Sequence, residues 1–281
     1  MNEDRYDRNT RLFGLDGQRK LRDASVAIVG VGGLGSHVAQ QLALLGVGAI
    51  ALIDKEELSH NNRNRYVGAR DTDPIPGSKK VDIARRLIVD INAAVRTIEV
   101  AQDLCSQAAF DAVKSATHVF GCLDDDGPRF VLNDLTTAFA IPYIDLATDV
   151  VAGEFGGRVF VNWTGAACLF CVGELNQTAI QEYLESSDDR INRESIYGIR
   201  HSDLGEAGPS VVSVNGVVAS LAVTEFMSGA TGIARPKTFL NYRGNQSRVL
   251  VRECNGRADC PYCRQWGHGN STDPDRYFRH R

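Results

Sequence analysis

The stretch of sequence that decides the fold is residues 24–54, A-S-V-A-I-V-G-V-G-G-L-G-S-H-V-A-Q-Q-L-A-L-L-G-V-G-A-I-A-L-I-D. An apolar run at 26–29 ends in four closely spaced glycines, which are Gly30, Gly32, Gly33 and Gly35. The glycines open a predicted helix, and a second apolar run at 50–53 ends on Asp54. The order strand, glycine turn, helix, strand and acid is typical of a nucleotide site.

Each part of this pattern has a physical role. Glycines let the backbone turn tightly and let phosphate oxygens approach its N–H groups, and the helix N-terminus adds partial positive charge. A carboxylate such as that of Asp54, at the end of the next strand, can hold the ribose hydroxyls. A glycine-rich turn alone also occurs for purely structural reasons. Its placement between two strands and before an acid favours the nucleotide-binding interpretation.

The bulk composition excludes several classes of protein. The chain has 281 residues, 43% hydrophobic and 23% charged, which suits one large α/β domain. A net charge of −4 argues against general binding to nucleic acids or to membranes. We find no apolar run of the roughly 18–20 residues that span a bilayer, and the start of the chain is too charged for a signal peptide. These features predict a cytoplasmic protein.

Alternating apolar and amphipathic segments predict the organisation of the chain. We expect strands near 25–30, 49–54, 97–101, 117–122 and 142–146 and helices near 34–46, 78–91, 106–115 and 128–140. This alternation predicts a doubly wound, largely parallel, Rossmann-like sheet. Strands near 157–162, 237–241 and 247–252 and a long helix from Pro209 to about Met227 extend it. Within this plan, a helical arm occupies 1–23, the main domain 24–265, a polar crossing segment about 174–207, and a flexible tail 266–281.

The connection after Asp54 is unusually long for a turn between a strand and a helix. It carries a cluster of basic residues on an otherwise acidic protein: Arg63, Arg65, Arg70, Lys79 and Lys80. Cations beside a glycine turn can neutralise a polyphosphate during transfer. The alternative is an ordinary solvated charged loop, and the adjacent glycine turn favours the functional interpretation.

Three consecutive carboxylates, Asp124, Asp125 and Asp126, follow the fourth predicted strand. Their charges repel one another unless a cation lies nearby, and Mg²⁺ with an oxygen shell would serve while it also binds phosphate. Helix capping is the alternative, with Asp126 before Gly127 and Pro128. We assign capping to Asp126 and the metal to Asp124.

The chain contains seven cysteines, and four of them form two C-x-x-C pairs. The pairs are Cys168 with Cys171 and Cys260 with Cys263, far apart in the sequence. Together they can supply the four thiolates of a tetrahedral, structural zinc site. Two disulfides or a redox pair are the alternatives, and both fit a reducing compartment less well. Cys105, Cys122 and Cys254 are interpreted as buried or incidental thiols.

At this point the residues resemble the MoeB/ThiF family, the bacterial relatives of ubiquitin-activating enzymes. The resemblance covers nearly the whole chain. It rests on R-Y-D-R at 5–8, G-x-G-G-L-G at 30–35, N-N-R-N-R at 61–65, G-S-K-K at 77–80, the spacing of Asp124, Arg129 and Asn133, and the two C-x-x-C pairs. No single motif is decisive, but their order and spacing are specific.

The resemblance implies a defined activity. A carboxylate, usually the C-terminal glycine of a ubiquitin-like or sulfur-carrier protein or of a peptide, attacks the α-phosphorus of ATP and displaces pyrophosphate. By position, Gly30, Gly32, Gly33 and Gly35 line the nucleotide site and Asp54 holds the ribose. Asn62, Arg65 and Lys80 orient and neutralise the triphosphate, and Asp124 binds Mg²⁺. Arg8 reaches into the site of a partner subunit, which implies a homodimer.

The chain departs from the family pattern in two places. The family's D-x-D after the second strand is here Asp54-Lys55-Glu56, and the segment 174–207 contains no cysteine. Family members that transfer the acyl group to their own thiol usually carry that thiol there, so we expect the adenylate to be consumed by a separate protein. Two other functions stay open: an NAD(P)-dependent oxidoreductase, and a catalytically inactive module that binds a ubiquitin-fold partner.

Overall fold

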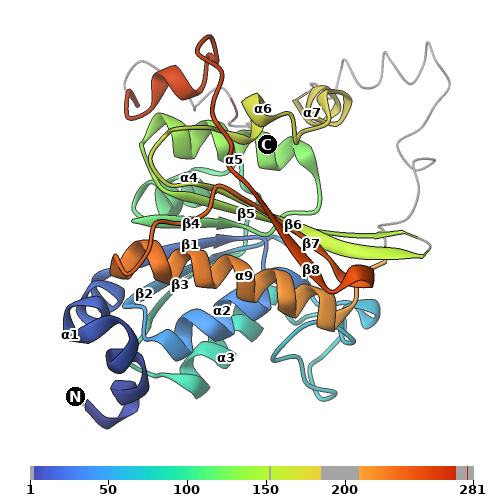
Figure 1. Cartoon of the computed structure of the whole chain (residues 1–281). Helices are drawn as coiled ribbons and strands as arrows, with labels where there is room; N and C mark the ends of the chain where they lie inside the picture. Colours follow the sequence, from blue (N-terminus) through green and yellow to red (C-terminus); the bar gives the residue numbers. More distant parts are fainter. Residues whose placement is uncertain (1–2, 152, 185–208, 270–276, 278–281) are drawn as a thin grey trace, which may run out of the picture.

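The computed structural model describes residues 3–151, 153–184, 209–269 and 277. Its centre is an eight-stranded sheet in the order β3-β2-β1-β4-β5-β6-β7-β8 (Figure 1). Strands β1 to β5 run parallel, and β6 to β8 extend the sheet antiparallel. Their bounds are Ser25–Val29, Ala49–Ile53, Arg96–Val100, His118–Gly121, Tyr143–Val151, Glu154–Asn162, Phe239–Arg243 and Arg248–Arg252. This confirms the predicted α/β sheet with its antiparallel extension.

Helices cover both faces of the sheet (Figure 1). Along β1, Val26 and Ile28 join the hydrophobic cluster on one face, whereas Ala27 and Val29 join the cluster on the other. Alternate residues of a strand point to opposite faces, so the continuous apolar run at 26–29 is the pattern of a strand buried on both sides. The helices are α1 Asp7–Asp23, α2 Gly33–Leu45, α3 Lys80–Ile91, α4 Gln107–Lys114, α5 Asp126–Ala138, α6 Leu169–Val172, α7 Gln177–Leu184 and α9 Val212–Thr231.

Strand β5 is longer than the predicted 142–146. It continues to Val151 and forms a hairpin with β6, which turns at Gly153 with a φ of +83°. The small residues that mark this hairpin have a packing role, because a Cβ on Gly156 would lie 2.0 Å from the carbonyl oxygen of Tyr242 on β7. The sequence pattern therefore located the strand pair, but the glycines concealed where the strands meet.

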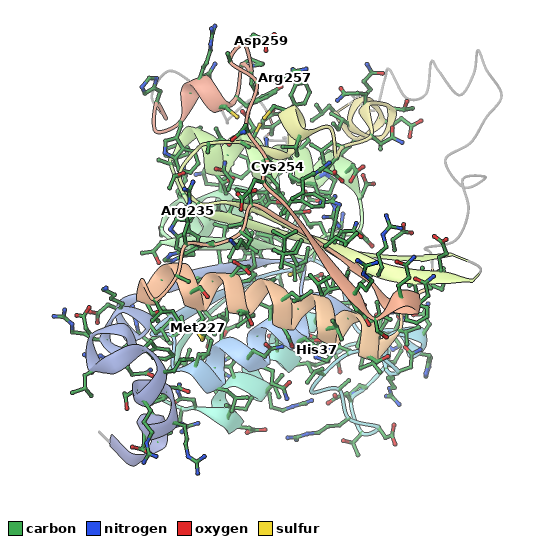
Figure 2. All side chains as sticks on the ribbon, in the orientation of Figure 1. His37, Met227, Arg235, Cys254, Arg257 and Asp259 are labelled. Atoms are coloured by element: carbon green, nitrogen blue, oxygen red, sulfur yellow. The ribbon has the colours of Figure 1, made fainter. Side chains whose placement is uncertain are left out.

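Helix α9 is largely apolar, although polar residues interrupt it and it contains no continuous apolar run of the roughly 18–20 residues that span a bilayer. By length and composition alone Val212–Thr231 is a candidate, although such helices also form the core of globular proteins. In this fold α9 packs against α2, α1, β5 and β6. Figure 2 shows His37 of α2 where the two helices meet, 3.4 Å from the position of a Cβ on Gly216. One face of α9 therefore packs on the domain, while another, which includes Val217, Ser220 and Thr224, is exposed.

Two described residues of the stretch expected to be a flexible tail pack against the domain. The ring of Trp266 lies over Gly165, where a Cβ would come within 2.5 Å of it. Tyr277 is 6% exposed and meets Phe130 edge to face, with the ring centroids 6.1 Å apart. The rest of 270–281 lies outside the described residues.

The glycine turn sets a steric limit that can be tested. A Cβ on Gly35 would lie 2.1 Å from the carbonyl oxygen of Gly30. We therefore expect Gly35→Ala to lower the free energy of unfolding by roughly 1–3 kcal/mol, the usual cost of overpacking, in urea unfolding followed by circular dichroism. Gly32→Ala is the matched control, because a Cβ there meets nothing within 4 Å. Equal unfolding midpoints for the two variants would contradict this packing.

Candidate functional site

The first feature of the site is Asp54, directly after β2. Its carboxylate accepts hydrogen bonds from the backbone N–H of Val31 and of Glu56, both 2.8 Å long. Burial raises the pKa of Asp54, and the positive charge of Lys80 opposes that shift. The carboxylate is thus fixed at the carboxyl edge of the parallel strands, beside the glycine turn, where Rossmann-like folds bind ligands.

The glycine turn between β1 and α2 is closely packed on two sides and open on another. A Cβ on Gly30 would lie 2.5 Å from the carbonyl oxygen of Cys122, after β4, and a Cβ on Gly33 would lie 2.4 Å from Nδ2 of Asn215 on α9. Gly32 has nothing within 4 Å of the same position. Side chains are therefore excluded where the turn meets its neighbours, while the backbone at Gly32 stays accessible to a ligand.

Lys80, the first residue of α3, has a side chain only 8% exposed. Its ammonium forms an ion pair with Glu56, and its backbone N–H donates to the carbonyl of Glu56 over 3.0 Å. The Tyr66 hydroxyl donates to the carbonyl of Lys80 over 2.7 Å. Glu56, the residue that departs from the D-x-D pattern, therefore holds the lysine at the end of β2.

The structure divides the basic cluster of the 55–79 loop. Arg63 donates to the carbonyl oxygen of Asp73 over 2.7 Å, and Arg70 pairs with Asp90 over 3.0 Å. Arg63 thus bonds within the loop, whereas Arg70 forms an exposed ion pair with α3. Lys79 is exposed. That the whole cluster serves a polyphosphate stays a prediction.

Asn62 is the last residue of the short helical turn η2, His60–Asn62, and Arg65 follows in the same loop. The stem of Arg65 passes 3.5 Å from the position of a Cβ on Gly33, and its guanidinium donates to Asn61 and Asn64. The Asn62 amide oxygen accepts from the Ser59 N–H over 3.3 Å. The structure therefore places Arg65 over the glycine turn and uses Asn62 to shape the loop.

The three consecutive carboxylates after β4 have three different environments. Asp125, not Asp126, is the N-cap of α5, and its carboxylate accepts from the Gly127 N–H over 2.8 Å. Asp126 lies one residue inside the helix and accepts from the Asn176 N–H over 2.9 Å. Asp124 is exposed, and within the described part of the chain no hydrogen bond or ion pair engages it. This corrects the capping assignment and leaves Asp124 as the carboxylate open to a ligand.

Arg8 does not lie at this site within one chain. It is exposed in the first turn of α1. Figure 1 shows α1 on the opposite side of the molecule from the loop between β2 and α3. The nucleotide-site residues and Arg8 therefore belong to separate regions of the monomer.

Part of the predicted crossing segment is described, and it packs against the start of α5. Helix α7 lies against α5, and Tyr183 covers the first turn of α5, where a Cβ on Gly127 would be 2.2 Å from that of Tyr183. Glu174 pairs with Arg252 over 2.8 Å. Residues 185–208 of the segment lie outside the described residues.

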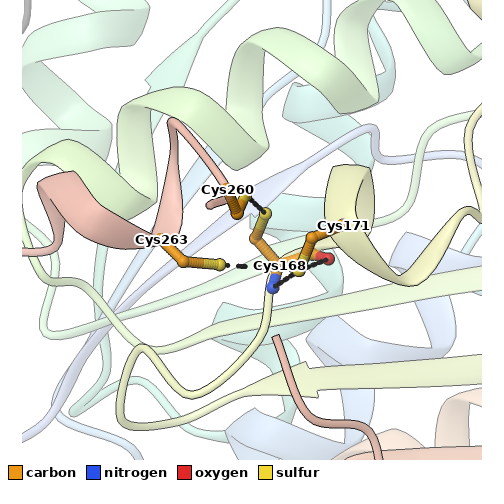
Figure 3. A group of neighbouring side chains, drawn as sticks. All are labelled: Cys168, Cys171, Cys260 and Cys263. Carbon is orange, nitrogen blue, oxygen red and sulfur yellow. Dashed lines mark hydrogen bonds between the residues drawn. The ribbon is translucent and has the colours of Figure 1, made fainter. Parts of the chain in front are cut away.

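The two C-x-x-C pairs come together as the spacing argument predicts. All four Sγ atoms lie within 4.8 Å of one another (Figure 3). The sulfurs of Cys168 and Cys260 are 3.7 Å apart, and those of Cys171 and Cys263 are 3.6 Å apart. The Cys263 thiol donates to Cys168 and is the main reason that the pKa of Cys168 falls to about 6. Four clustered sulfurs are a donor set for a tetrahedral metal ion.

A buried asparagine that the sequence analysis noted only for its spacing supports this cluster. The amide oxygen of Asn133 on α5 accepts from the Leu169 N–H over 2.9 Å, directly after Cys168. Asn133 is fully buried. It therefore fixes the start of α6, which carries the first cysteine pair, against α5. A polar residue on the buried face of a predicted amphipathic helix was the signal that could have identified this role.

The three cysteines outside the cluster are held in less reactive environments. Cys105 and Cys254 are buried, and the Cys105 sulfur lies 3.5 Å from the Tyr183 hydroxyl. Burial raises the pKa of Cys122 well above that of a free thiol. Nucleophilic cysteines need a lowered pKa and access to solvent. Burial keeps Cys105 and Cys254 from solvent, and the raised pKa of Cys122 disfavours its thiolate.

The fold and the carboxyl-edge residues define a Rossmann-like nucleotide-binding protein with a four-cysteine cluster. The ThiF family model matches residues 6–265, and the chain belongs to the ThiF family.

Two of the relatives that the chain matches are named as adenylyltransferases. The sulfur carrier protein ThiS adenylyltransferase of Escherichia coli strain K12 is 29% identical, and the match covers 96% of this chain and 97% of that protein. The maize adenylyltransferase and sulfurtransferase MOCS3-2 is 26% identical over 92% of this chain and 50% of its own length. The chain thus spans about half the length of the MOCS3-type relative. The crystal structure of E. coli MccB with ATP has a TM-score of 0.73 at 21% identity, covering 93% of this chain and 75% of that one, which shows the fold.

The ion pair that holds the 55–79 loop predicts a pH dependence of stability. Arg86 binds both carboxylate oxygens of buried Asp73, at 2.6 and 2.8 Å, and these bonds lower the pKa of Asp73. A carboxylate whose pKa is lowered on folding stabilises the folded state at pH values above its unfolded pKa of about 3.9. This stabilisation is lost as the pH falls through the pKa of the folded state. We therefore expect wild type to exceed Asp73→Asn in urea-unfolding stability at pH 7. The difference should shrink below about pH 4, and a constant difference would contradict the assignment.

Proposed function

We propose that this protein catalyses the ATP-dependent adenylylation of a C-terminal glycine carboxylate on a ubiquitin-like or sulfur-carrier protein or on a peptide. A carboxylate oxygen attacks the α-phosphorus, the bond to the β-phosphate oxygen breaks, and pyrophosphate leaves. The observation that carries the proposal is the gathering of the glycine turn, Asp54, Lys80 and the 122–126 loop at one edge of the sheet in a ThiF-family chain.

The proposed roles follow from the environment of each residue. The open backbone at Gly32 receives phosphate oxygens, and Asp54 exchanges its backbone N–H partners for ribose hydroxyls. Arg65 and Lys80 supply positive charge where negative charge develops on the leaving pyrophosphate. Lys80 must then leave Glu56, and this ion pair keeps its side chain in place before the nucleotide binds. Positioning and charge stabilisation are sufficient for such a transfer.

Asp124 fits a magnesium ion by its chemistry. It offers an exposed carboxylate beside the glycine turn, and Mg²⁺ in nucleotide sites is usually held by one or two carboxylates plus phosphate oxygens. When bound, the ion shields the charge of the triphosphate. Asp125 and Asp126, engaged by the backbone of α5 and of residue 176, are not proposed as ligands.

We propose zinc for the four-cysteine cluster. Four protein thiolates fill a tetrahedral shell, so the ion is structural and leaves no open coordination position for catalysis. It would link the end of the antiparallel region, at Cys260 and Cys263, to the start of α6. The metal bonds would add to the contact between Phe170 and Tyr262, whose ring centroids are 4.9 Å apart.

Arg8 is proposed to act in the site of a second copy. It is exposed on α1, away from the nucleotide residues of its own chain (Figure 1). A homodimer that brings α1 of one subunit to the loop of the other would add this guanidinium to the triphosphate site. The proposed functional unit is therefore a homodimer.

The acyl-adenylate is proposed to pass to a separate protein, without a thioester on this chain. The 174–207 segment contains no cysteine, and Cys105, Cys122 and Cys254 have raised pKa values or are buried. Their reduced state suits the cytoplasm, where we place the protein.

An NAD(P)-dependent oxidoreductase is the second candidate, because the glycine turn and Asp54 would also hold a dinucleotide. Hydride transfer gives no role to Asp124 or to the buried Lys80. Calorimetric titration with ATP and Mg²⁺ against titration with NAD⁺ separates the two functions.

The magnesium assignment predicts the behaviour of two adjacent variants. Asp124→Asn should lower ATP–pyrophosphate exchange by about 100-fold or more, measured with glycine-ended ubiquitin-fold proteins from the same genome, and leave the unfolding midpoint unchanged. Asp125→Asn is the matched control, since asparagine caps a helix as well as aspartate does. Near-normal exchange in Asp124→Asn, or equal losses in both variants, would contradict the assignment.

The zinc assignment predicts that Cys260→Ser is purified without its metal and unfolds at lower temperature. Removal of one of four thiolates both weakens metal binding and unlinks the two segments. Metal content is measured by plasma mass spectrometry and stability by thermal unfolding. Cys254→Ala is the control, because Cys254 is buried but lies outside the cluster. One equivalent of zinc retained in Cys260→Ser would refute the assignment.

A further inference from the structure

The inference concerns Arg129, a buried arginine on the first turns of α5. It is 4% exposed, and its guanidinium reaches three parts of the chain. Nη1 donates to the Asp145 carboxylate over 2.6 Å and to the carbonyl of Leu146 over 3.0 Å, both on β5. Nη2 donates to the carbonyl oxygen of Leu123, and Nε lies 3.6 Å from Asp126. Arg129 therefore joins β5, the first turn of α5 and the loop that carries Asp124.

Neutralisation of Asp145 does not by itself explain this arrangement. Asp145 is fully buried, but Arg158 also donates to it over 2.7 Å and the Tyr143 hydroxyl donates over 2.9 Å. A buried carboxylate with these two donors already has a cationic partner and a neutral one. The hydrogen bond from Nη2 of Arg129 to the Leu123 carbonyl is not needed to neutralise Asp145 and calls for another explanation.

The hydrogen bond from Nη2 holds the peptide group directly before Asp124. The peptide unit is planar, so a bond to the Leu123 carbonyl sets the plane that joins Leu123 to Asp124. On the upstream side the Cys122 N–H donates to the Val29 carbonyl over 2.8 Å, and on the downstream side Asp125 caps α5. The backbone at Asp124 is fixed on both sides, while its side chain stays exposed.

We infer that Arg129 is a positioning residue for Asp124: it holds the Leu123 carbonyl so that the Asp124 carboxylate faces the metal of a nucleotide complex. This inference rests on the proposed function, in which Asp124 binds the metal. A guanidinium suits the task because its fork of donors serves strand and loop at once, whereas an ammonium is a compact point charge. Groups that orient a metal ligand typically change metal affinity by 10–100-fold when removed.

The test measures metal binding and not turnover. The probe is Mn²⁺ with the non-hydrolysable analogue AMPCPP, and bound Mn²⁺ is quantified by electron paramagnetic resonance. AMPCPP affinity without metal is measured by calorimetry. Arg129→Gln should weaken metal binding in the nucleotide complex by about 10-fold or more, with metal-free nucleotide affinity unchanged. A structural role alone would alter both affinities together.

Arg158→Gln is the matched control, because it removes the other cationic partner of Asp145 without touching Leu123. We expect it to leave Mn²⁺ affinity within about twofold, the level of a change outside the site. If both variants lose metal equally, or if Arg129→Gln keeps wild-type Mn²⁺ affinity, the inference is overturned. Arg129→Lys keeps the positive charge beside Asp145 but loses the forked set of guanidinium donors. The same Mn²⁺ measurement is made on this variant if Arg129→Gln does not fold. Arg129→Lys should fold and still bind Mn²⁺ less tightly than wild type.

The same experiment separates this inference from the proposed function. If wild type shows no metal-dependent binding of AMPCPP, the proposed function fails and the inference with it. If Asp124→Asn abolishes Mn²⁺ binding while Arg129→Gln and Arg129→Lys do not weaken it, the function stands and only the role of Arg129 is wrong.

Discussion

The site depends on the close approach of the glycine turn to the ends of two strands. Gly30 has a φ of +85° and leaves no room for a Cβ against the Cys122 carbonyl, and Gly35 leaves none against Gly30. This contact seats the start of α2 on β1 and brings the loop after β4 beside the turn. Without it, the backbone N–H groups of the turn and the carboxylates of the 124–126 stretch would not share one edge of the sheet.

Pairing of charges then determines which residues remain for chemistry. Of the basic residues in and after the long loop, Arg63 bonds within the loop, Arg70 pairs with α3, and Lys80 is kept in place by Glu56. Of the three neighbouring carboxylates, two are used by α5 and the crossing segment. A cluster of like charges in a sequence therefore overstates a site, because the fold employs part of the cluster for its own loops and helix ends.

The sequence predicted most of the sheet because its signals are local. Apolar runs, glycines and caps fixed the strands and helices within a few residues, and the spacing of Cys168, Cys171, Cys260 and Cys263 predicted a cluster that the structure brings together. The rest depends on contacts between distant residues. Asp125 could not be distinguished from Asp126 as the cap, since the two are adjacent at the start of the same helix. The partners of Arg63 and Arg129, at Asp73 and Asp145, are set by the fold and have no local pattern.

The buried network around Asp145 lies beneath the loop that carries Asp124 and restricts the positions of that loop. Asp145 gathers Arg129, Arg158 and Tyr143 in the interior, and these donors offset the cost of burying its charge. Such a network stores little net stability, but it leaves few alternative positions for the groups that it joins. The Leu123 carbonyl is one of these groups, so the order of the interior extends to the exposed Asp124. A transfer that relies on the placement of charge, and not on a covalent intermediate, depends on this kind of order.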